Sequence, residues 1–320
     1  MQDSPADVAL ARRILAGEPT GHAELYDRYA TPLYAYCHSM LLDRERALGA
    51  LGVTFMIAVC RLGELRDADR LRPWLYALAR NECRCRADGR AGPGPAGLAA
   101  AAEGDAGDAE QARDERQDSE PSRGEDGEPP PAAELSQAGI AAAAMRWLSL
   151  DDRDVIELCL RHHLIGPDLN DVLGLPAGRA HAAITRACTR LRRALGTLLV
   201  ARWGREDCPD LDGMLAGWDG RPTVLMRQRV RRHIGCCDTC RSREEREVPP
   251  EALAGLLAAA AEPTPPPGLR DDVLRLLAEI APAATEGDLI ADLVAHRAGS
   301  FGSSGFPAPP RRGIWRAGRR

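Results

Sequence analysis

An acidic segment rich in glycine, proline and alanine interrupts this chain and argues against one continuous core. Residues 91–139 carry three arginines against twelve acidic residues, and Pro129-Pro130-Pro131 lies near the end of the segment. The segment has no apolar periodicity, so it cannot bury enough apolar surface to offset the entropy lost on ordering it. We therefore expect residues 89–139 to form a disordered acidic linker between separately folded parts.

The sequence on both sides of this linker has helical periodicity and no strand-like alternation. Before the linker, apolar residues recur every three or four positions and so share one helix face: Leu25, Tyr29, Leu33, Tyr36 and Met40. Only 4% of the residues are aromatic, so the cores must rely on leucine, alanine and valine, of which the first two favour helices. The expected fold is all-α. We expect helical domains at 1–88 and 140–205, a small metal-binding helical domain at 206–246, and a Pro-rich, partly helical tail at 247–320 that is disordered from Gly299.

Charge is distributed unevenly, although the whole chain has a net charge of −5. All 42 basic residues are arginine, and seven of them lie between Arg179 and Arg205, where no acidic residue occurs. A short helix ending at Gly174 precedes this basic helix, and two helices joined by a tight glycine-containing turn are typical of a helix-turn-helix. The alternative is an ordinary amphipathic helix with a solvated arginine face. The candidate DNA contacts on the basic helix are Arg179, His181, Thr185, Arg186 and Arg190.

Both helical blocks resemble regions 2 and 4 of extracytoplasmic-function sigma factors. The residues that carry the resemblance are Ala23–Leu33 and Arg72–Asn81 in the first block, and Leu148–Ile156, Val172–Pro176 and Ile184–Ala187 in the second. The resemblance implies a first block that binds core RNA polymerase and opens the promoter around its −10 element. It implies a second block that reads the −35 element in the major groove.

The same resemblance places four residues of the first block near the −10 DNA: Arg80, Asn81, Arg84 and Arg86. One segment departs from the family pattern. Family members usually carry acidic and amide side chains just before the Thr-Phe of their second helix, and these side chains contact the polymerase. Here Ala47–Val53 precedes Thr54-Phe55, so a sigma-like regulator without initiation activity stays open as an alternative.

A cluster of cysteines and one histidine follows the basic helix. His233 and Cys237 are four residues apart, and Cys237 and Cys240 form a Cys-x-x-Cys pair. One more ligand completes a tetrahedral site, and Cys208 is the natural candidate. Thiolate and imidazole ligands suit Zn²⁺, which can replace a missing core in so small a segment.

This segment resembles the zinc-binding anti-sigma domain, in which an upstream ligand precedes His-x-x-x-Cys-x-x-Cys. The upstream ligand is commonly histidine, so Cys208 is a departure. Cys236 is an alternative ligand, and a metal-free hairpin with incidental cysteines is the competing interpretation. Zinc in this position can be structural or redox-sensing, since members of that domain family can lose zinc on oxidation.

Other patterns limit the possible functions. We find no phosphate-binding glycine loop and no nucleophile–base pair, so catalysis is not expected. No uninterrupted apolar run reaches 18 residues and the N-terminus is polar, so we expect a cytoplasmic protein without a membrane partner. We interpret Trp74 as a core anchor, and Cys83 and Cys85 as structural.

These patterns favour a sigma-factor-like transcription initiation or regulation protein with a built-in zinc-binding regulatory module. A contact between the zinc module and a helical block, within one chain or between chains, would mask that block. The alternatives are a degenerate sigma-like DNA-binding or protein-binding regulator, and a zinc-dependent anti-sigma-type interaction protein.

Overall fold

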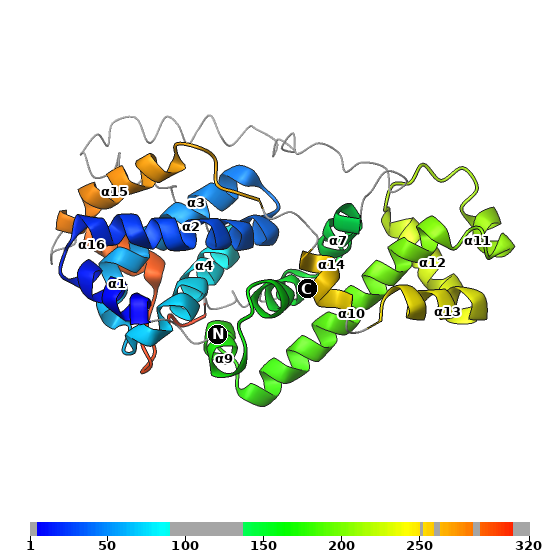
Figure 1. Cartoon of the computed structure of the whole chain (residues 1–320), viewed down its shortest axis with the longest axis horizontal. Helices are drawn as coiled ribbons and strands as arrows, with labels where there is room; N and C mark the ends of the chain where they lie inside the picture. Colours follow the sequence, from blue (N-terminus) through cyan, green and yellow to red (C-terminus); the bar gives the residue numbers. More distant parts are fainter. Residues whose placement is uncertain (1–4, 90–136, 250–251, 259–262, 284–288, 310–320) are drawn as a thin grey trace, which may run out of the picture. The chain divides into compact units, whose positions relative to one another are not determined.

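The computed structural model describes residues 5–89, 137–249, 252–258, 263–283 and 289–309. These residues form helices joined by turns, with one isolated bridge between Phe301 and Pro307 and no β-strand among them. The all-α prediction is confirmed for this part of the chain. The expected linker, apart from its first and last residues, lies outside the described residues. The helices group into two compact units, which are described separately (Figure 1).

The first unit is built on four consecutive helices. They are α1 (Pro5–Leu15), α2 (Pro19–Leu41), α3 (Arg44–Arg61) and α4 (Leu71–Ala87), with short 3₁₀ turns at Leu62–Glu64 (η1) and Ala68–Arg70 (η2). Local sequence sets the boundary between α2 and α3. Leu42 adopts a left-handed conformation that ends α2, and the Asp43 carboxylate accepts a hydrogen bond from the Arg46 N–H at 2.8 Å, which caps α3.

The core of this unit lies where α2, α3 and α4 pack together. The residues predicted to share one face of the first long helix are buried: Leu25, Tyr29, Leu33, Tyr36 and Met40. Trp74 is fully buried on α4, and residues 299–309 contribute to this burial, since the Gly305 carbonyl accepts from its indole N–H. The Tyr36 and Tyr76 rings meet edge to face with centroids 5.8 Å apart, which joins α2 to α4.

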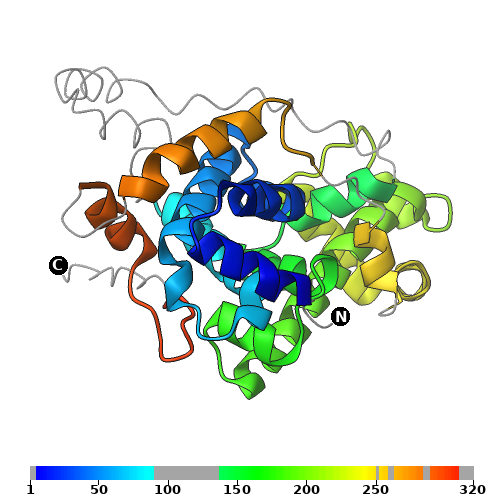
Figure 2. The same ribbon diagram turned by 60° about the vertical axis from the view of Figure 1, so that its left-hand side comes forward.

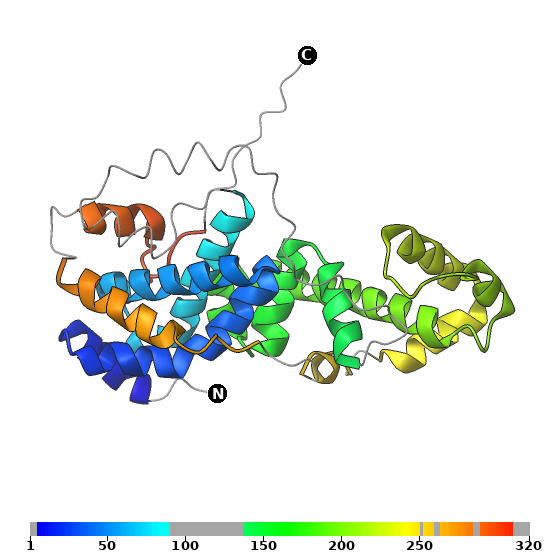
Figure 3. The same cartoon turned by 90° about the horizontal axis from the view of Figure 1, so that it is seen from above.

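Two helices from the end of the chain complete the first unit. Both α15 (Leu269–Ala283) and α16 (Leu289–Ala298) pack on α3, and α15 also contacts α2 (Figures 2 and 3). Residues 299–309, which we call the strap, follow α16 and lie on α4. Phe306 of the strap is only 5% exposed. The expectation of disorder from Gly299 is therefore wrong for residues 299–309, because this segment buries an aromatic ring. Residues 310–320 lie outside the described residues.

The second unit is organised around one long helix, α10 (Ala177–Trp203). The helices α7 (Gln137–Arg146) and α8 (Leu150–Ile156) pack against it, and a π-helical turn (η4, Glu157–Arg161) extends α8. The Ser149 hydroxyl caps α8 by accepting a hydrogen bond from the Asp152 N–H at 3.2 Å. The remaining helices are α11 (Pro209–Met214), α12 (Val224–Cys236), α13 (Asp238–Glu247) and α14 (Ala252–Ala258).

The predicted helix-turn-helix spans the two units. Its first helix, α9 (Gly166–Leu173), belongs to the first unit and packs on α4, whereas α10 belongs to the second. Arg70 holds α9 in place, because its guanidinium donates to Asp168 at 2.8 Å and to Asp171 at 2.7 Å. Gly174 ends α9 with a φ of +65°, which suits glycine. The helix-turn-helix itself stays a prediction.

One helix among the described residues is long and apolar enough to cross a membrane. It covers Arg44–Glu64, with a mean hydropathy of 1.5, and 61% of the tested window is buried within the protein. A buried core helix passes the same test, so the helix is weak support for a membrane span. The expected cytoplasmic location stays a prediction.

Candidate metal centre

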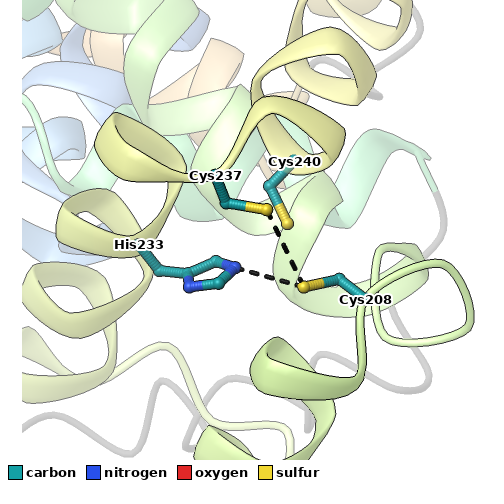
Figure 4. A group of neighbouring side chains, drawn as sticks. All are labelled: Cys208, His233, Cys237 and Cys240. Atoms are coloured by element: carbon teal, nitrogen blue, oxygen red, sulfur yellow. Dashed lines mark hydrogen bonds between the residues drawn. The ribbon is translucent and has the colours of Figure 1, made fainter.

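The four predicted metal ligands converge on one point in the second unit (Figure 4). Cys208 lies at the N-terminal cap of α11, His233 lies in the last turn of α12, and Cys237 joins α12 to α13. Cys240 lies in the first turn of α13 and is 1% exposed. The ligating atoms of the four side chains all lie within 4.8 Å of one another.

The separations match a tetrahedral metal site. With metal–sulfur bonds of about 2.3 Å and metal–nitrogen bonds of about 2.0 Å, a tetrahedron has sulfur–sulfur edges of about 3.8 Å and sulfur–nitrogen edges of about 3.5 Å. The Cys208 Sγ lies 3.9 Å from the Cys237 Sγ and 3.3 Å from the His233 Nε2. The cluster can therefore hold a metal ion, and its donor set is compatible with zinc and with other soft transition metals.

Backbone hydrogen bonds and burial shift the pKa values of the cluster's thiols in opposite directions. The Leu211 N–H donates to the Cys208 Sγ at 3.4 Å, which satisfies the sulfur at the start of α11. The pKa of Cys237 is lowered, chiefly because the Cys240 backbone N–H hydrogen-bonds to its sulfur. Burial raises the pKa of Cys240, and its hydrogen bonds with Cys208 and Cys237 add to the effect. A bound cation would deprotonate these thiols, since coordination requires thiolates.

The ligand-bearing hairpin of α12 and α13 packs on the C-terminal half of α10. Arg231 of α12 forms an ion pair with Glu244 of α13, which is only 8% exposed. Glu244 in turn lies against Gly196 of α10. A β-carbon added to Gly196 would come within 2.5 Å of a carboxylate oxygen of Glu244. Arg192 of α10 donates to the Val248 carbonyl at 2.9 Å. The metal centre thus belongs to a module that packs against the basic helix α10.

Cys236 is not part of the cluster. It is exposed, and its thiol hydrogen-bonds to the His233 carbonyl at 3.3 Å. The structure therefore brings together the predicted ligand set and leaves the alternative ligand outside it.

The candidate DNA contacts on α10 lie near the N-terminal end of that helix. Arg179, His181, Thr185 and Arg186 are all exposed. Arg190 is also exposed but is paired with Asp152 of α8 at 2.7 Å. The opposite face of α10 is buried at Ala187, Leu191, Leu195 and Leu198. Ile184 is only half-buried.

The candidate DNA contacts on α4 are less accessible. Arg80 and Arg86 are 6% and 7% exposed, and Arg84 is half-buried. Asn81 is engaged by the strap, since its side-chain amide donates to the Ala308 carbonyl at 2.8 Å. No sequence signal predicts this contact, because the strap presents a backbone carbonyl in a Gly/Ser/Pro-rich segment. Comparison of the chain with protein-family models, curated proteins and solved structures finds no match in any of the three.

Proposed function

We propose that this protein is a sigma-factor-like transcription initiation or regulation protein that binds promoter DNA through α10 and carries its own zinc-binding module. The observation that carries the proposal is the exposed N-terminal part of α10, where Arg179, His181, Thr185 and Arg186 project from a helix without acidic residues. A helix that enters the major groove presents its N-terminal residues to base edges, and its arginines contact guanine or phosphate. The sigma-factor resemblance of the flanking sequence supports the same assignment.

The zinc module has a regulatory role in this proposal. Zn²⁺ would be held by Cys208, His233, Cys237 and Cys240, and it would fix the start of α11 to the junction of α12 and α13. The hairpin then stays packed on α10 through Glu244 and Arg192. This packing is consistent with an anti-sigma-like contact formed within one chain. It leaves the N-terminal part of α10 exposed.

A second candidate function is a DNA-binding regulator without initiation activity. The favouring observation is the burial of Ala47, Ala50, Leu51, Gly52 and Val53 on α3, in the segment that lacks the acidic and amide side chains of the family. Binding to core RNA polymerase separates the two candidates.

DNA binding by α10 can be tested with a duplex selected from a random library and labelled for fluorescence anisotropy. Arg186→Ala should weaken binding by about 1–3 kcal/mol if Arg186 contacts a base. If it contacts phosphate, the salt dependence of log K should fall by about one unit. Arg146→Ala on α7 is the matched control, because it removes one exposed arginine elsewhere on the second unit. Equal effects of the two substitutions would contradict the proposal.

A further inference from the structure

The strap covers one surface of α4 through a small set of specific contacts. The Trp74 indole N–H donates to the Gly305 carbonyl at 2.8 Å, and the Asn81 amide donates to the Ala308 carbonyl at 2.8 Å. The Phe301 ring stacks on Trp74 with centroids 6.4 Å apart. The strap thus satisfies two side-chain donors of α4 and covers its indole ring.

Two arginines complete the surface beneath the strap. The Arg61 guanidinium lies 5.3 Å from the centroid of the Phe301 ring, and the Arg70 guanidinium lies 4.6 Å from that of Phe306. Arginine planes and an indole that stack on aromatic rings, beside amide and indole donors, form the set of groups that binds single-stranded nucleic acid. A bound single strand would have to displace the strap, because its bases would stack where the phenylalanine rings lie and its acceptors would replace the strap's carbonyls.

We propose that the strap is an autoinhibitory segment that covers a single-stranded DNA surface on α4. The inference rests on the proposed sigma-like function and on the sequence resemblance, which implies that the first helical block opens DNA. It adds that the chain masks this surface itself, with residues 299–309. The masking segment is separate from the zinc module, which packs on α10 of the second unit.

The strap fits closely at one residue. Gly305 has a φ of +81°, and a β-carbon there would collide with the Glu64 carbonyl. Any side chain at this position is therefore both strained and blocked. Gly302 is a matched control, because a β-carbon there would meet, among the described residues, only the Phe306 carbonyl oxygen at 3.7 Å, an ordinary contact.

The test compares the full-length chain with its Gly305→Ala and Gly302→Ala variants. Strap release is measured as the rate of chymotryptic cleavage after Phe301, since Pro307 blocks cleavage after Phe306. DNA access is measured as the affinity for a fluorescent random-sequence single-stranded oligonucleotide. If the strap is closed in about nine of every ten molecules, its release should tighten binding about tenfold. We expect Gly305→Ala to show faster cleavage and tighter binding, and Gly302→Ala to match the unmodified chain.

A variant with both Phe301→Ala and Phe306→Ala covers the case in which Gly305→Ala stays closed. This double variant removes the ring contacts without changing α4. If the strap of the Gly305→Ala variant stays closed, that variant tests only how closely residue 305 fits, and the double variant tests the proposal. Accelerated backbone exchange at residues 299–309 replaces cleavage as its readout. A released strap with unchanged affinity for single-stranded DNA overturns the proposal, and so does a strap that neither variant releases. Failure of the proposed function is recognised separately, as loss of duplex binding through α10.

Discussion

Replacing Glu82 with glutamine should destabilise the first unit far more than the same change at a partly exposed glutamate. Glu82 lies on α4, and its side chain is 2% exposed. Its Oε1 accepts from the Arg86 Nε at 2.6 Å and from a terminal nitrogen of Arg297 at 2.6 Å. One buried carboxylate therefore neutralises two arginines and holds α16 against α4.

The magnitude follows from the burial of the partners. The side chains of Arg86 and Arg297 are 8% and 9% exposed, so water cannot replace the lost negative charge. Removing one partner of a buried ion pair costs about 3–5 kcal/mol, because the remaining charge stays buried and uncompensated. Glutamine keeps one acceptor oxygen and nearly the same volume, so we expect a loss of about 3 kcal/mol in the free energy of unfolding.

The assay is urea unfolding followed by pulsed alkylation and mass spectrometry of Cys37 and Cys83, which are both fully buried in the first unit. Glu24→Gln is the matched control. Glu24 also pairs with two arginines, but its side chain is 33% exposed, and pairs of this kind contribute about 1 kcal/mol or less. A Glu82→Gln loss no larger than the Glu24→Gln loss would refute the reasoning.

Three further predictions concern single side chains. Cys237→Ser should abolish stoichiometric zinc binding, whereas Cys236→Ser should retain it. Elemental analysis of the purified chains measures the zinc content. Equal zinc in both variants would exclude Cys237 as a ligand. Burial lowers the pKa of His22, so the unfolded chain takes up its proton first, and stability should fall as the pH drops below about 6.5. His22→Gln should flatten this part of the stability profile, and an unchanged profile would contradict the assignment. Burial raises the pKa of Cys60 to about 11, so at pH 8 iodoacetamide should modify exposed Cys236 well before Cys60, and equal rates would contradict it.

The metal centre could be predicted from sequence because most of it is local. His233, Cys237 and Cys240 lie within eight residues around the junction of α12 and α13, so three ligands come from one short segment. Cys208 lies 25 residues upstream, where only its chemistry points to a ligand, yet it reaches the same point. The helical content was equally accessible, since apolar periodicity is a local property.

The tertiary role of the chain end could not be predicted in the same way. The strap is rich in glycine, serine and proline, a composition typical of disorder. Its attachment depends on backbone carbonyls that accept from Trp74 and Asn81, and carbonyls carry no sequence signal. The conformation of Gly305, which permits the close approach to Glu64, is also invisible without the fold.

Gly49 shows how a residue that weakens a helix can have a packing role. Gly49 lies in Ala47–Val53, the segment before Thr54-Phe55 that departs from the family pattern. In the structure, a β-carbon on Gly49 would come within 2.8 Å of the Arg86 guanidinium. The glycine thus leaves room for the buried arginine that pairs with Glu82. The resemblance places Arg86 near DNA, whereas its burial depends on the space at Gly49, which the sequence alone does not reveal.

The most direct test of the sigma-like assignment is binding to core RNA polymerase. The Gly305→Ala chain, immobilised and zinc-loaded, should retain core enzyme and should open the selected duplex only when the core enzyme is present, as measured by permanganate reactivity of unpaired thymines. Retention of core enzyme together with duplex opening is the result that the account predicts. Tight duplex binding through α10 with no retention of core enzyme would contradict it and would favour a regulator without initiation activity.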